Sequence, residues 1–239
     1  MLSRLILSSG FIFMGTAACF AQGFSGAELG IEYTDSSAIE EFGGVNYYGS
    51  AEFELAYGFS AAFSASSYNF DVGTTDVSNL TAHLIYNVDA ATALGLFIGQ
   101  DYVDDDSSDI FGAELAYDFG LGGIEVYVGS SSDAANNDFT IYGAATTYEM
   151  GSGFGLVANL DGLSGDDFSS SALEIGGFFQ LAQGPRFGAT LGQLSFDTGG
   201  VDESETYFGI QASIGVGPNG GTTFGSRDGF EAVRFASPF

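Results

Sequence analysis

Hydrophobic and polar residues alternate with a period of two along most of the chain. The clearest example alternates Val45, Tyr47, Gly49, Ala51, Phe53, Leu55 and Tyr57 with Asn46, Tyr48, Ser50, Glu52, Glu54 and Ala56. Successive side chains of a β-strand point to opposite faces, so such a segment has one apolar face and one small, polar or acidic face. The 3.6-residue period of an amphipathic helix is missing from the sequence over comparable lengths. The pattern therefore predicts an all-β protein.

A repeat of about thirty residues underlies this alternation. Tyr57, Tyr86, Tyr117 and Tyr148 each precede a tight turn, and they lie 29, 31 and 31 residues apart. A repeat of this length corresponds to two antiparallel strands, one tight turn and one longer connection. Continued along the chain, it predicts about twelve strands, at 26–34, 43–57, 59–66, 78–87, 91–100, 110–118, 123–130, 139–149, 153–160, 171–181, 186–195 and 205–216.

The connections between these strands alternate in character. Six longer segments rich in Asp, Ser, Gly and Asn alternate with the tight turns; they are 35–41, 66–78, 101–109, 130–138, 161–170 and 197–205. Strands of about ten residues suit a tilted membrane crossing, and a tyrosine on the apolar face beside each turn suits an interfacial aromatic girdle. We predict an antiparallel transmembrane β-barrel with short periplasmic turns and longer acidic extracellular loops. The predicted girdle residues are Tyr57, Tyr86, Tyr117 and Tyr148.

With this organisation, residues 26–216 resemble Gram-negative outer-membrane porins, in particular the alpha-proteobacterial kind. The resemblance rests on the pattern of strands, turns and loops, and no short motif carries it. The chain departs from the large porins, which have about sixteen strands and a long loop folded into the pore. The resemblance implies a bacterial outer-membrane location and a channel for passive diffusion.

The two ends of the chain lie outside this repeat. Arg4, a short apolar run and the small residues up to Cys19-Phe20-Ala21 predict a cleaved secretion signal over 1–21. A retained membrane anchor and a lipidated Cys19 are the alternatives for this segment. The barrel is predicted over 22–216. Because Pro218-Asn219-Gly220-Gly221 interrupts the alternation, 217–239 is interpreted as a C-terminal tail or an irregular closing segment.

The chain is strongly acidic, with 31 Asp and Glu residues against four Arg and no Lys. This excludes nucleic acid as a partner. Nineteen of the acids lie in the six longer connections, which predicts an acidic extracellular rim that attracts cations, including divalent cations. Within the rim, Asp104, Asp105 and Asp106 are a calcium candidate, although their spacing is not that of an EF-hand and a solvated loop explains them equally. No cofactor and no other metal site are predicted.

Parity along the strands also predicts which charged side chains line the lumen. They are Glu32, Glu52, Glu54, His83, Glu114, Glu125, Glu174 and Arg186. Carboxylates in a water-filled lumen concentrate cations and repel anions. His83 has no serine partner on the apolar face, so no enzyme is predicted.

The sequence thus predicts a porin-like channel for small hydrophilic solutes with a weak preference for cations, embedded in outer-membrane lipid. An alternative is a non-conducting structural or adhesive barrel, because Tyr48, Phe97, Tyr127 and Phe178 point inward and could fill the lumen. A soluble secreted β-domain is the third interpretation. The sequence specifies no oligomeric state.

Overall fold

The computed structural model of the protein describes residues 23–36, 43–70, 76–104, 106–133, 138–166, 168–182, 184–199 and 202–227. The predicted signal at 1–21 and the end of the chain from 228 lie outside these residues. The described part contains no helix with the length and apolar character of a membrane span.

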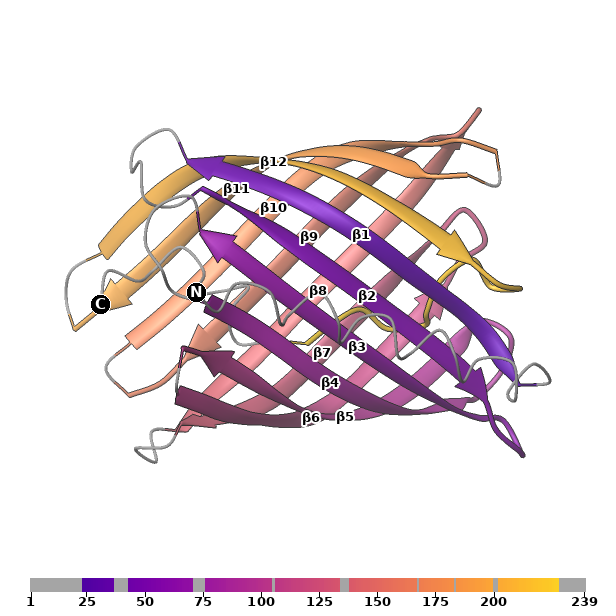
Figure 1. Ribbon diagram of the computed structural model, residues 1–239, viewed down its shortest axis with the longest axis horizontal. Coiled ribbons are helices and arrows are strands. Elements are labelled where there is room, and N and C mark those ends of the chain that lie inside the picture. The colour runs from indigo at the N-terminus through magenta and orange to yellow at the C-terminus, as the bar shows by residue number, and fades with distance from the viewer. Residues whose placement is uncertain are drawn as a thin grey trace, which may run out of the picture.

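Twelve antiparallel strands form one closed barrel, as the sequence predicted (Figure 1). Their bounds are β1 Phe24–Ser36, β2 Gly44–Glu54, β3 Phe59–Phe70, β4 Asp76–Asn87, β5 Thr92–Val103, β6 Asp106–Asp118, β7 Gly122–Asp133, β8 Asp138–Gly151, β9 Phe154–Ser164, β10 Phe168–Gln180, β11 Arg186–Thr198 and β12 Asp202–Val216. Each strand pairs with the next one in sequence, and β12 pairs with β1 from Ala27↔Val216 to Ser36↔Tyr207. Since the ladder closes on itself, no barrel strand has an unpaired edge.

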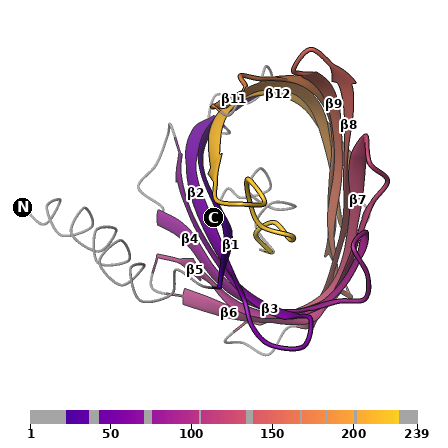
Figure 2. The ribbon, with the colours of Figure 1, turned by 90° about the vertical axis from the view of Figure 1, so that its right-hand side faces the viewer.

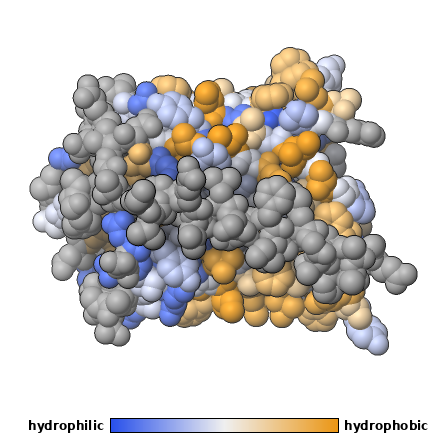
Figure 3. Space-filling view, in the orientation of Figure 1, coloured by the Kyte–Doolittle hydropathy of each residue, from blue (hydrophilic) through white to orange (hydrophobic). Residues whose placement is uncertain are grey.

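The two faces of the barrel wall differ as the alternation requires. On β5, Leu96 and Ile98 point outward and are 60% and 66% exposed, whereas Phe97 between them is 1% exposed. The polar side chains Glu52 and His83 are buried on the inside. Figure 3 shows hydrophobic residues over the middle and right of the visible face, with hydrophilic residues gathered toward the left. This outer belt suits contact with lipid hydrocarbon.

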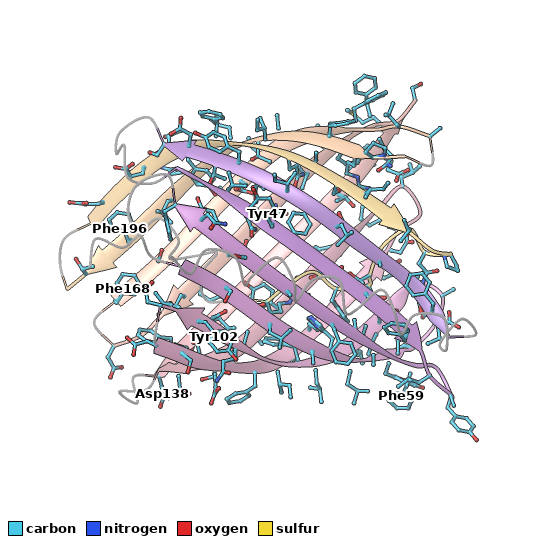
Figure 4. The ribbon with its side chains drawn as sticks, in the orientation of Figure 1. Tyr47, Phe59, Tyr102, Asp138, Phe168 and Phe196 are labelled. Carbon is cyan, nitrogen blue, oxygen red and sulfur yellow. The ribbon has the colours of Figure 1, made fainter. Side chains whose placement is uncertain are left out.

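Several strands continue into segments that the sequence predicted as loops. In place of a loop over 101–109, β5 runs to Val103 and β6 begins at Asp106. Tyr102, Asp138, Phe168 and Phe196 all lie toward the barrel end at the left of Figure 4, here called the loop end, and Phe59 lies toward the opposite turn end. Polar composition does not end a strand there, because antiparallel pairing satisfies the backbone while Asp and Ser side chains face water.

The turn end also differs from the prediction in one place. The sequence predicted a strand over 43–57, but β2 ends at Glu54 and Tyr57 lies in the following turn with a φ of 63°. That left-handed conformation is uncommon for a residue with a β-carbon, and it takes Tyr57 out of the strand ladder.

Five inward-facing aromatic rings each lie over a glycine of the neighbouring strand. The directly paired residues are Tyr48 and Gly30, Phe97 and Gly112, Tyr127 and Gly143, Phe178 and Gly155, and Tyr207 and Gly192. A β-carbon added at any of these glycines would lie 2.1–2.4 Å from the partner ring. These pairs explain part of the high glycine content, because the absent side chain makes room for the ring and the ring covers the bare backbone.

We expect Gly143→Ala to destabilise the barrel by about 1–3 kcal/mol, as overpacking commonly does. The new β-carbon would meet Cε1 of Tyr127 at 2.3 Å and Oδ1 of Asp161 at 2.6 Å. Gly177→Ala is the matched control, since its β-carbon would meet only the Gly155 carbonyl oxygen at 3.4 Å. Urea unfolding of both variants in lipid vesicles checks this, and equal midpoints for the two would contradict it.

The turn between β4 and β5 is closed by a carboxylate. Oδ1 of Asp89 accepts hydrogen bonds of 2.8 Å from the backbone N–H groups of Ala91 and Thr92. These bonds favour the charged form and lower the pKa of Asp89 below its ordinary value. Their stabilisation is therefore present above the pKa of the unfolded chain and is lost as the pH falls through the folded pKa.

We expect an NMR titration of the folded protein to give an Asp89 pKa below that of the same carboxyl in the urea-unfolded chain. An equal or higher pKa in the folded protein would contradict the hydrogen-bonded turn.

Candidate functional site

The chain turns back into the barrel after the last strand. Gly217 has a φ of 91°, the N–H of Gly220 donates to the Gly217 carbonyl at 3.2 Å, and the N–H of Asn219 donates to the Ser25 carbonyl at 2.9 Å. Figure 2 shows the segment after β12 inside the ring of strands. We call residues 217–227 the C-terminal segment. Proline and glycine at this point end the strand and allow the reversal.

The first half of the C-terminal segment is held by β2 and by an apolar pocket. The hydroxyl groups of Thr222 and Ser50 lie 3.0 Å apart, and the N–H of Thr223 donates to Oε2 of Glu52 at 2.7 Å. Phe224 is 1% exposed and packs with Ala62, Ile85 and Ala93, while its ring stacks on the ring of His83 at 6.2 Å between centroids. Phe224 therefore anchors the segment by apolar burial.

Arg227 anchors the second half through its charge. Its Nε donates to Oε2 of Glu114 at 3.0 Å, and its Nη2 forms an ion pair with Oε1 of Glu125. The guanidinium lies 4.5 Å above the centroid of the Tyr127 ring. Two carboxylates and an aromatic face are the groups that guanidinium prefers, because its planar N–H fork donates to carboxylates while its face stacks on rings.

The backbone of Arg227 is also recognised. Its carbonyl oxygen accepts hydrogen bonds of 2.8 Å from Nδ2 of Asn79 and from Oγ1 of Thr81. Both side chains are buried on β4. We call Asn79, Thr81, Glu114, Glu125 and Tyr127 the Arg227 seat.

A buried polar network connects the seat to the only histidine of the chain. Oε1 of Glu114 lies 2.7 Å from Nδ1 of His83, while the other oxygen of the same carboxylate accepts from Arg227. Nε2 of His83 has no hydrogen-bond partner among the described residues. On β4, Nδ2 of Asn79 also donates to Oδ1 of Asp101 at 2.7 Å. Glu114 therefore couples the ring of His83 to the guanidinium of Arg227.

The structure brings together four of the eight residues predicted to line the pore, and the C-terminal segment connects them. Glu52, His83, Glu114 and Glu125 all contact this segment. The other four are Glu174, Arg186, Glu32 and Glu54, which lie elsewhere on the barrel wall.

Glu174 and Arg186 lie across the barrel on β10 and β11. Oε2 of Glu174 accepts from Nδ2 of Asn159 at 3.3 Å, and Arg186 lies 4.4 Å over the ring of Phe178. Glu32 is half-buried on β1, and Glu54 is exposed at the end of β2. Within the described residues, these four side chains are not part of the cluster around the Arg227 seat.

The predicted girdle and calcium residues lie at opposite ends of the barrel. Tyr86, Tyr117 and Tyr148 are 44–46% exposed on the outer face near the turn end, and Tyr57 is 94% exposed. Their interfacial role stays a prediction. Asp104 precedes β6, Asp106 begins it, and residue 105 lies outside the described residues. Within the described ranges no three Asp, Glu, His or Cys side chains form a group suited to a metal ion.

Sequence reasoning placed the acidic residues of the site but missed their partner. Arg227 falls within the predicted C-terminal tail, where no periodicity in the sequence indicates which face or element its side chain contacts. The usable signal was chemical: a lumen with several inward carboxylates is a place where one of the few arginines of the chain can find a charge partner.

A cavity of about 660 Å³ remains beside the C-terminal segment. The turn ends of the strands from β4 to β8 line one side of it, and residues from Asn219 to Thr223 line the other. Its carboxylates are those of Asp89, Asp118, Glu125 and Glu149. The lumen is therefore partly filled, and the remaining space at the turn end is polar and acidic.

Comparison with known proteins identifies the fold through structure alone. The sequence matches no protein-family model and no curated protein. Among solved structures, the KdgM porin superposes with a TM-score of 0.58 at 7% identity, covering 78% of this chain and 97% of that chain. The NanC porin gives 0.55 at 10% identity, covering 78% and 98%. The CymD monoaromatic hydrocarbon channel gives 0.50 at 9% identity, covering 87% and 93%.

Proposed function

We propose that this chain, whose closed antiparallel barrel has the fold of the porin structures named above, is an outer-membrane channel for the passive diffusion of small hydrophilic solutes, with a weak preference for cations. The observation that carries the proposal is the cavity at the turn end, which is lined by the carboxylates of Asp89, Asp118, Glu125 and Glu149. Fixed carboxylates of this kind raise the cation concentration inside a pore.

The outer face supports the proposed location. Large apolar side chains are exposed along every side of the barrel, which a protein surrounded by water rarely shows. We propose that the chain reaches the outer membrane after export and removal of residues 1–21. Solutes and cations are then its partners in the lumen, with lipid around it and divalent cations at its acidic loop end. The structural neighbours support a channel: one KdgM structure is described as a complex with disordered oligogalacturonate.

The C-terminal segment favours a second candidate function. Phe224 and Arg227 are almost fully buried within the barrel, and Phe97 and Phe178 are buried on its inner wall. A lumen filled in this way could belong to a structural or adhesive barrel that conducts nothing. We favour the channel because the cavity beside the segment is lined by polar and acidic groups, which a purely structural filling does not require.

We propose no catalytic role for the lumen. Nδ1 of His83 is held by Glu114, and the ring of Phe224 covers one face of the imidazole. This arrangement supports the anchoring of the C-terminal segment, and within the described residues it pairs His83 with a carboxylate rather than with a nucleophile.

Planar-bilayer recording of the refolded full-length protein tests the proposed function. We expect discrete conductance steps and, in a potassium chloride gradient, a reversal potential whose sign shows that potassium passes more readily than chloride. Chloride preference would overturn the cation assignment. Complete absence of steps, with the barrel shown to be folded by circular dichroism, would favour the non-conducting candidate.

A further inference from the structure

We propose that the Arg227 seat is a recognition site for guanidinium-bearing amino acids or peptides, and that the chain's own Arg227 occupies it as a built-in ligand. This inference rests on the proposed function, which it deepens by naming the class of solute. The seat then selects a solute, and the C-terminal segment is the plug that such a solute displaces.

The contacts to the side chain of Arg227 select guanidinium over other cations. Glu114 and Glu125 come from neighbouring strands, β6 and β7, and accept from two different nitrogens of the same planar group. The guanidinium carbon also lies over the Tyr127 ring, 4.5 Å from the ring centroid. An ammonium group lacks both the fork and the flat face that these contacts match.

A second and independent set of contacts recognises a carbonyl group. Asn79 and Thr81 are 4% and 0% exposed, and both donate to the carbonyl oxygen of Arg227. An inorganic cation offers these two buried donors no acceptor, so the bonds that they now make to the Arg227 carbonyl would be lost. The ligand that satisfies both sets carries a guanidinium and a carbonyl, as an arginine residue does.

His83 supplies a further polar atom beside the seat. It is 3% exposed, its Nδ1 lies against Glu114, and within the described part of the chain its Nε2 has no hydrogen-bond partner. The ring of Phe224 stacks on this imidazole. Departure of Phe224 with the C-terminal segment would uncover Nε2, so a larger ligand than the side chain alone has a polar contact available next to the seat.

The C-terminal segment is attached in a way that permits displacement. Most of its hydrogen bonds to the described barrel residues involve a side chain, as where the backbone N–H of Thr223 donates to the Glu52 carboxylate, and the twelve-strand ladder closes without it. The segment can therefore leave without unpairing any strand. A soluble guanidinium compound that binds Glu114 and Glu125 would compete directly with Arg227 and shift the segment away from the seat.

The test uses the full-length Arg227→Ala variant in detergent, which leaves room for a guanidinium between the two carboxylates. The probe is N-acetyl-L-arginine amide, and its neutral isostere N-acetyl-L-citrulline amide is the control. By isothermal titration calorimetry we expect one saturable site for the arginine probe, bound at least tenfold more tightly by Arg227→Ala than by the unaltered protein. The added substitution Glu114→Gln should abolish this binding, and Arg186→Ala alone should behave as the unaltered protein does.

Equal affinity of Arg227→Ala for the arginine and citrulline probes would overturn the proposal, and so would equal affinity of both proteins for the arginine probe. Because the measurement needs no membrane and no current, its failure is distinct from failure of the proposed channel.

A second measurement, made on the unaltered protein, tests the proposal even if the Arg227→Ala variant does not fold. In the unaltered protein, the arginine probe should accelerate chymotrypsin cleavage after Phe224 several-fold relative to the citrulline probe, as detected by the mass of the fragment ending there. Equal cleavage rates with both probes would equally overturn the proposal.

Discussion

Arg227→Glu is expected to raise single-channel conductance several-fold. The substitution places a third carboxylate between Glu114 and Glu125, where the structure now has a buried guanidinium. Loss of a buried pair of this kind costs about 3–5 kcal/mol, before the repulsion among the carboxylates is added. That free energy favours release of the C-terminal segment, and the lumen then widens by the volume the segment occupied. Planar-bilayer recording of the variant beside the unaltered protein measures the change.

Arg186→Glu is the matched control for this experiment. Arg186 also lies inside the barrel, but its contacts are with Gln180 and Phe178. It should alter ion preference without opening the lumen. Unchanged conductance in Arg227→Glu, together with unchanged protease resistance after Phe224, would show that the C-terminal segment does not restrict the pore.

Ile98→Arg is expected to destabilise the barrel in lipid by about 2–4 kcal/mol, the cost of a lipid-facing cation near the middle of a bilayer. Ile98 lies near the middle of β5, points outward and is 66% exposed. Equilibrium unfolding by urea in phospholipid vesicles gives the free energy directly.

Tyr102→Arg provides the comparison for Ile98→Arg. Tyr102 points outward from the same strand, but lies near its loop end, where a charge costs about 0–1 kcal/mol (Figure 4). If Ile98→Arg and Tyr102→Arg cost the same, the apolar belt does not lie in hydrocarbon, and a soluble β-domain becomes the better interpretation.

Three measurements on the barrel answer separate questions about its lumen. Recording from the unaltered protein asks whether the barrel conducts, Arg227→Glu asks whether the C-terminal segment restricts conduction, and calorimetry asks what the Arg227 seat binds. A barrel that binds the arginine probe without conducting would keep the recognition site and discard the channel. A conducting barrel without arginine binding would do the reverse.

The alternation of apolar and polar residues in the sequence determined which side chains of the barrel wall face inward and which face outward. Parity placed Glu114 and His83 on the inner face and Leu84 on the outer face, and all three lie there. This succeeds because the direction of a side chain in a strand is a local property, set by the pleat. The number of strands could also be predicted from local sequence, because the tight turns between strands contain Gly, Asn or Asp.

The positions at which the strands end depend on pairing with the neighbouring strand, and the amino-acid composition of a segment does not reveal that pairing. Asp101 and Asp109 lie in a segment whose polarity resembles a loop, yet Asp101 pairs with Ser108 and Asp109 with Gln100 across the β5–β6 ladder. Polarity records contact with water, and a paired strand beyond the hydrocarbon contacts water just as a loop does. Only the register of the neighbouring strand distinguishes the two cases.

The place of the C-terminal segment was decided by tertiary structure alone. Arg227 and Glu114 are 113 residues apart in sequence. The charges that attract the guanidinium come from two neighbouring strands and become one site only after the barrel has closed. The sequence determined which carboxylates face the lumen, whereas the closed ladder determined that they meet around one point. A segment without periodicity takes its position from that assembled field of charge and apolar surface, which no local stretch of sequence contains.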